Sequence, residues 1–96
     1  MSNYDFRIEA DAVYQESALE MQRLYNELLD FLDDQGRREL TDAQEAWSVF
    51  AEKQARFSAG LMRGGTGESL LYLQEMNSLT RARVTALHEA LRERSA

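Results

Sequence analysis

The chain contains no cysteine and no proline, and its single histidine is His88. Without cysteine the fold needs no disulfide, so a reducing compartment is acceptable. No apolar run approaches the roughly 20 residues of a membrane span. Residues 1–13 also lack the basic and apolar segments of a signal peptide. We therefore expect a cytoplasmic protein that does not bind membranes, or a periplasmic one if a signal was removed.

Basic residues are scarce, because 11 Lys and Arg oppose 17 Asp and Glu for a net charge of −6. The acids are concentrated in residues 1–45, which hold 12 acidic and 4 basic side chains. Nucleic-acid binding is not expected, since it draws on cations that neutralise phosphates. The acidity fits either solubility alone or a cationic protein partner whose encounter it accelerates.

Apolar residues recur in steps of three and four along the first segment, which is the spacing of an amphipathic helix. This stripe comprises Phe6, Ala10, Val13, Ser17, Met21, Leu24, Leu28 and Phe31. Gly36, in the sequence DDQGRRE, follows the last periodic residue. Because glycine suits a helix C-cap, Gly36 predicts the end of this long helix.

A second helix is predicted to begin at Thr41, since Thr41 and Gln44 have the spacing of a capping box, and to fade near Gly60. Its stripe comprises Ala43, Trp47, Phe50, Gln54 and Phe57. A third helix is predicted from near Glu68 to about Arg94. Its stripe comprises Leu70, Leu73, Asn77, Thr80, Val84, Leu87 and Leu91.

No strand signal is present, so the 96 residues predict one all-α domain, 1–96. We expect a small antiparallel bundle of about three helices, with one long helix and two shorter ones. The aromatic stripe of the second helix, Trp47, Phe50 and Phe57, is expected to fill the core.

The loop between the second and third helices is rich in glycine. Its glycines are Gly60, Gly64, Gly65 and Gly67. A nucleotide site needs a lysine after these glycines or a strand before them, and the sequence offers neither. The loop therefore predicts a structural turn or a partner contact. The alternative is an anion site at the start of the third helix, with Thr66 or Ser69 as N-cap. Gly65→Val is expected to strain the loop if Gly65 has positive φ.

No catalytic or metal-binding constellation stands out. His88 has no accompanying cysteine or second histidine. Asp33 and Asp34 are adjacent in a solvated segment, whereas Glu52 and Glu75 lie on different predicted helices and are expected on solvated faces. We expect no enzyme, no cofactor and no metal.

Two segments, LTDAQEAWSVFAEKQARF from Leu40 and GGTGESLLYLQEMNSLTRARVTAL from Gly64, resemble the LprI-like family of lysozyme inhibitors. The matching positions are Leu40, Ala43, Gln44, Ala46, Trp47 and Phe50, then Gly64, Gly65 and Thr66, then Leu79, Thr80, Arg83 and Leu87. The resemblance implies a helical, protein-binding inhibitor. Ala55 and Glu75 stand where the family has its two cysteines, which agrees with an intracellular bacterial member.

We therefore predict a non-catalytic module that neutralises a partner enzyme or toxin, such as a basic hydrolase, by surface occlusion, in the manner of an immunity protein. The expected contacts are Arg63, Gly64, Gly65, Thr66 and Glu68, with Asp30, Asp33 and Asp34. Among the matched residues, Trp47, Phe50, Leu79 and Leu87 are expected in the core.

Two polar matched residues are expected to bind within the fold. We expect Arg83 to hold a carboxylate or a loop carbonyl, and Thr80 to bond a backbone carbonyl. The alternative function is a self-associating module, in which an uncovered part of the first-helix stripe pairs with a second copy or a partner helix.

Overall fold

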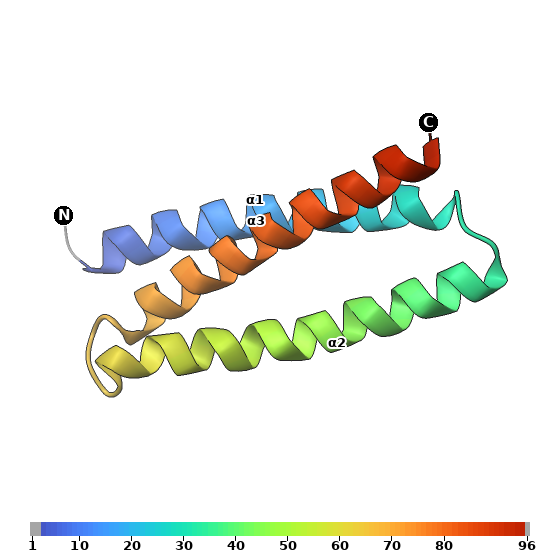
Figure 1. Ribbon diagram of the computed structural model, residues 1–96. Helices are drawn as coiled ribbons and strands as arrows, with labels where there is room; N and C mark the ends of the chain where they lie inside the picture. Colours follow the sequence, from blue (N-terminus) through green and yellow to red (C-terminus); the bar gives the residue numbers. More distant parts are fainter. Residues whose placement is uncertain (1–2, 96) are drawn as a thin grey trace.

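The structure, a computed structural model, describes residues 3–95 as three helices joined by short connections (Figure 1). They are α1 (Asn3–Leu29), α2 (Asp34–Ala59) and α3 (Glu68–Ser95), and a 3₁₀ turn, η1 (Gly60–Met62), follows α2. No strand is present in this described part, so the predicted all-α class is confirmed. The first helix is long, as predicted, but α1, α2 and α3 have 27, 26 and 28 residues, so the three are nearly equal and the other two are not distinctly shorter.

The helices run up, down and up, with α2 antiparallel to α1 and α3 (Figure 1). α3 packs against both other helices, whereas the backbones of α1 and α2 hardly approach each other. The principal extents are 47 × 22 × 14 Å. Because the bundle is long and thin, each helix leaves a wide outer face at the surface.

The first core cluster joins α1 to α3 and consists of Leu24, Leu28, Val84 and Leu87, all buried. Burying a side chain of this size stabilises a fold by about 1.5–3 kcal/mol. The stripes predicted for these two helices supply all four residues. Three other members of the first stripe, however, lie exposed instead of buried: Phe6, Val13 and Phe31. Phe31 lies beyond the end of α1, in the turn before α2.

Two polar residues of the predicted stripes also meet between α1 and α3. The hydroxyl of Ser17, itself buried, donates a hydrogen bond of 2.7 Å to Oδ1 of Asn77. This bond satisfies a polar group that would otherwise be buried at a cost. It therefore fixes the register of the two helices.

The second core cluster joins α2 to α3 through Ala51, Ala55 and Met76. Ala51 and Ala55 are fully buried, and Ala59 continues the row. Trp47 packs at the edge of the cluster, together with the half-buried Tyr14 of α1. Small residues at four-residue spacing let the backbones of two helices approach closely, so alanine forms the buried face of α2.

The expectation that Phe50 and Phe57 fill the core is therefore wrong. Phe50 is 53% exposed and Phe57 is 77% exposed. Each residue of an α-helix turns by about 100°. A face centred on Ala51 and Ala55 consequently places both phenylalanines on the flank of α2.

The predicted boundary between the first two helices is also wrong. α1 ends at Leu29, and Gly36 lies in the first turn of α2 instead of capping α1. The Asp33 side chain is the N-cap, accepting a hydrogen bond of 2.8 Å from the Gly36 amide. An aspartate in this position satisfies an amide that the helix leaves unpaired.

Thr41 and Gln44 consequently lie inside α2 and form no capping box. Their side chains link helices instead. The Thr41 hydroxyl lies 3.1 Å from the Tyr25 hydroxyl of α1, and Gln44 lies between α1 and α3. The sequence pattern was a chance match to the capping motif, since Asp33 provides a cap earlier in the chain.

Candidate protein-binding surface

The glycine loop makes a tight turn from η1 into α3. Gly64 has φ of +78°, the conformation that glycine adopts without strain. Gly65 does not have positive φ. The backbone strain that Gly65→Val would cause at a positive φ is therefore expected at Gly64 instead. The Gly65 amide donates to the Met62 carbonyl at 2.8 Å, and a Cβ on Gly65 would lie only 3.1 Å from that oxygen. Both glycines are therefore required by the turn, for different reasons.

Gly64→Ala is expected to lower the free energy of unfolding by about 1 kcal/mol, because an L-residue in the left-handed region is strained. Gly60→Ala is the matched control. Gly60 has φ of −59°, and its added Cβ would meet only the flexible end of Arg63. Urea denaturation followed by circular dichroism measures both, and equal losses would contradict the assignment of the strained position to Gly64.

The start of α3 does not present the anion site that was the alternative interpretation of the loop. α3 begins at Glu68, so Gly67 precedes it and neither Thr66 nor Ser69 occupies the N-cap position. The Glu68 carboxylate lies in the first turn, where it already interacts favourably with the helix dipole. This carboxylate would repel a second anion, which leaves the structural turn or partner contact that the sequence predicts for the loop.

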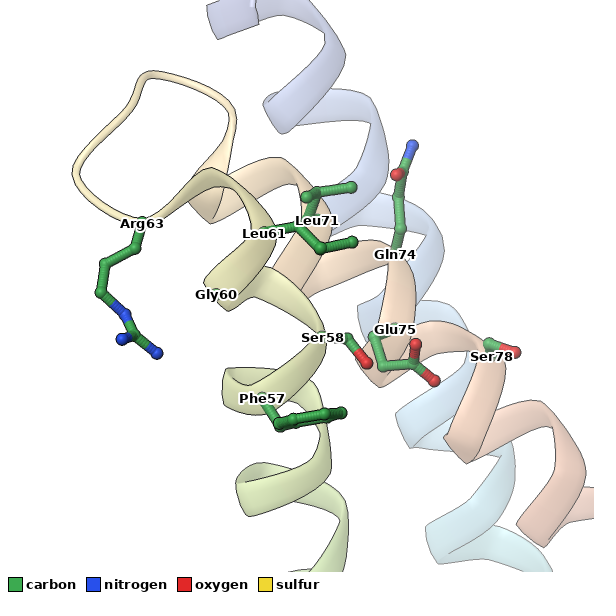
Figure 2. A pocket seen from close by; sticks show the side chains of 9 residues that line it. All are labelled: Phe57, Ser58, Gly60, Leu61, Arg63, Leu71, Gln74, Glu75 and Ser78. Atoms are coloured by element: carbon green, nitrogen blue, oxygen red, sulfur yellow. The ribbon is translucent and has the colours of Figure 1, made fainter.

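Beside the loop, α2 and α3 enclose an open groove of about 660 Å³ (Figure 2). We call it the α2–α3 groove. Its lining comprises Phe57, Ser58, Gly60, Leu61, Arg63, Leu71, Gln74, Glu75 and Ser78. Phe57 and Leu61 lie one turn apart and are 77% and 88% exposed. Two large apolar side chains left in water beside a groove are typical of a surface that contacts a partner.

Figure 2 shows how the side chains of the groove are directed. The Phe57 ring extends from α2 toward α3, whereas the Arg63 side chain points away from the groove. Arg63 therefore connects the groove to the glycine loop without filling it. Sequence reasoning missed Leu61 and Leu71. The available signal was the spacing of Phe50, Phe57 and Leu61, which forms a second apolar stripe on α2 beside the alanine face.

The predicted acidic contacts lie at the opposite end of the molecule. Asp30 and Asp33 lie in the turn between α1 and α2 and Asp34 is the first residue of α2, while Gly64 and its neighbours join α2 to α3 (Figure 1). The 26 residues of α2 separate the two turns. Since an α-helix rises about 1.5 Å per residue, they are about 40 Å apart. The structure does not bring the acids and the loop into one contact surface.

The matched family residues mostly build the interior. Leu40 packs against the first core cluster, to which Leu87 belongs, and Leu79 packs against the second. Their positions agree with a structural role. Phe50, Ala43 and Ala46, in contrast, are exposed on α2.

Gln44 and Arg83 form a polar bridge between helices. Nε of Arg83 donates to Oε1 of Gln44 at 2.9 Å, and Nε2 of Gln44 lies 3.5 Å from the sulfur of Met21. Burial lowers the pKa of Arg83 from its ordinary value. The bridge therefore ties all three helices together, and Arg83 holds a side-chain amide instead of the expected carboxylate or loop carbonyl.

The prediction for Thr80 is also wrong. Its hydroxyl is buried and has no hydrogen-bond partner among residues 3–95, so the expected bond to a carbonyl is not formed. The residue contributes packing between the helices.

Other chemistry finds little support in the described residues. His88 is exposed on α3. No group of three or more histidine, cysteine, aspartate or glutamate side chains within residues 3–95 is arranged to hold a metal ion. No helix in this part of the chain is long and apolar enough to span a bilayer.

Comparison with known proteins gives one match. The family described as Lysozyme inhibitor LprI matches residues 1–87. This match confirms the resemblance and covers α1, α2 and most of α3. No curated protein and no solved structure matches the chain significantly.

Proposed function

The chain belongs to the LprI family of lysozyme inhibitors, and we propose that it is a non-catalytic inhibitor that binds a lysozyme-like enzyme. The whole chain, 1–96, acts as a single binding domain. It blocks the partner by covering its surface, and no bond of the inhibitor is made or broken. A lysozyme-like toxin delivered to the cell is included in this class of partner, in which case the chain acts as an immunity protein.

The observation that carries the proposal is the α2–α3 groove. Phe57 and Leu61 are the side chains that a partner can desolvate at the lowest cost to the fold, because neither contributes to the core. The glycine turn beside them is closed by the hydrogen bond from the Gly65 amide to the Met62 carbonyl, with Gly64 at positive φ. A preformed turn loses little entropy on binding. We therefore include Arg63, Gly64, Gly65 and Thr66 in the contact.

The acidic residues have a different role in this proposal. Asp30, Asp33 and Asp34 are too far from the groove to touch the same small partner surface. They contribute to the negative field of the chain, which accelerates the approach of a basic enzyme and weakens with added salt.

The proposal is tested by adding the purified chain to a purified lysozyme and measuring both affinity and cell-wall lysis. Titration calorimetry is expected to give saturable binding with one chain per enzyme, and lysis is expected to fall in proportion to the bound fraction. Binding without inhibition would exclude occlusion of the active site. Absence of binding to lysozymes of different classes would show that the partner is not a lysozyme.

Self-association is the second candidate function, and the exposed stripe of Phe50, Phe57 and Leu61 favours it. Such a stripe along one helix can pair with the same stripe of another copy. The uncovered stripe was expected on the first helix, where Phe6 and Val13 are indeed exposed, and α2 adds Phe50 and Phe57. Light scattering at two concentrations separates the candidates, because a chain that stays monomeric leaves the stripe free for another partner.

A further inference from the structure

The α2–α3 groove contains a carboxylate without a partner. Glu75 lies partly buried on α3, and it forms no hydrogen bond or ion pair with any residue of the described range 3–95. Arg63 is a cationic member of the groove lining, but its side chain points away (Figure 2). A carboxylate that faces a groove can accept hydrogen bonds from a cationic donor that enters it. A cationic side chain of a binding partner would therefore interact favourably with Glu75 in this groove.

The side chains around Glu75 indicate which kind of cation fits the groove. Ser58 and Ser78 also line the groove and add hydroxyl oxygens that accept hydrogen bonds. Phe57 presents an exposed aromatic ring, and Leu61 adds an apolar wall. One anionic acceptor, two neutral acceptors and an aromatic ring surround a single open space. A small hydrated metal ion would gain nothing from the aromatic and aliphatic walls.

We propose that the α2–α3 groove binds an arginine side chain of the partner protein, with its guanidinium on Glu75 and against the ring of Phe57. This inference rests on the proposed function, in which the same groove contacts the partner. Arginine fits better than lysine because its planar guanidinium presents five donors, stacks on aromatic rings and is less strongly hydrated. A guanidinium and a carboxylate form paired, charge-assisted hydrogen bonds. The arginine methylenes pack against Leu61.

The net charge of the chain agrees with this occupant. At −6, the protein attracts partners that present basic residues. Long-range attraction brings such a surface close, and the groove then selects one side chain by shape and hydrogen bonding. Charge alone would not distinguish this groove from the acidic turn before α2, so the placement of Glu75 beside Phe57 carries the specificity.

The test is a titration of the full, isotope-labelled chain with N-acetyl-arginine methylamide, followed by amide resonances in NMR spectra. We expect saturable shifts of Leu61, Leu71 and Glu75. The citrulline analogue, which has nearly the same shape but no charge, is expected to bind at least about tenfold more weakly. Glu75→Gln is expected to weaken arginine binding by a similar factor, whereas Glu45→Gln, which removes the same charge from an exposed site elsewhere on α2, is expected to leave it unchanged.

Three results would overturn the inference: no saturable shift in the groove, equal binding of the citrulline analogue, or unchanged binding in Glu75→Gln. Circular dichroism of both variants verifies that they remain folded, which is expected because Glu75 forms no hydrogen bond or ion pair with the described residues. The proposed function fails separately. If the chain binds arginine but no lysozyme, the arginine site stands and the proposed lysozyme partner is wrong. If a lysozyme binds at the groove but arginine does not, only the inference about arginine is wrong.

Discussion

Replacing Trp47 by alanine is expected to lower the free energy of unfolding by about 3 kcal/mol, the usual cost of truncating a large aromatic core residue. Trp47 packs against the cluster of Ala51, Ala55 and Met76, next to Tyr14. The alanines are too small to close the space that the indole leaves. Denaturation followed by circular dichroism at 222 nm measures the loss, since the variant has no tryptophan fluorescence.

Phe50→Ala is the matched control on the same helix. Phe50 follows Trp47 by three residues but is exposed and belongs to neither core cluster. Its truncation is expected to cost about 0.5 kcal/mol or less, as at other surface positions. Equal losses in the two variants would show that both side chains share one environment, which would contradict the orientation of α2.

Phe57→Ala combined with Leu61→Ala is expected to weaken binding to the partner lysozyme by at least about thirtyfold. This factor corresponds to about 2 kcal/mol, the lower limit for residues that dominate an interface. Both side chains are mostly exposed, so the melting temperature is expected to change little. Titration calorimetry measures the affinity.

Leu19→Ala provides the control for this pair of substitutions. Leu19 is 72% exposed on α1 and lines none of the grooves described above. Its truncation removes exposed apolar surface outside the α2–α3 groove, and binding is expected to remain unchanged. Loss of affinity in Leu19→Ala, with retention in the Phe57 and Leu61 variant, would place the interface on α1.

The sequence allowed the helices to be predicted better than their orientation. The glycines after residue 60 marked the second turn correctly, because several adjacent residues favour a turn there. The first turn was placed too late, since Gly36 resembles a C-cap whereas Asp33 acts as an N-cap. One glycine next to several acids fits either role, and only the three-dimensional path of the chain decides between them.

The buried face of α2 was the larger difficulty. Trp47, Phe50 and Phe57 dominate the hydrophobic pattern, so they define an apparent core face. The actual face is centred on Ala51 and Ala55, whose importance comes from the close approach of α3 and not from their hydrophobicity. Sequence periodicity does not reveal the distance between helices. The same reorientation turned Phe57 from an expected core residue into a candidate contact.

Glu75 shows why the candidate site could not be predicted from the sequence. On its own it was one acidic residue among 17 and was expected on a solvated face. Its position between α2 and α3, without a counter-ion in the described structure, became visible only when the groove was assembled from both helices. The contacts predicted at the loop remain adjacent to this groove, whereas those predicted at Asp30, Asp33 and Asp34 do not.

The most direct test of the binding surface is an NMR footprint of unlabelled lysozyme on the isotope-labelled chain. The account predicts shifts or line broadening at residues 57–66 and at Leu71 and Glu75, with little effect at residues 30–34. A footprint confined to the turn at 30–34, or to the outer face of α1, would contradict the assignment of the α2–α3 groove as the inhibitory surface.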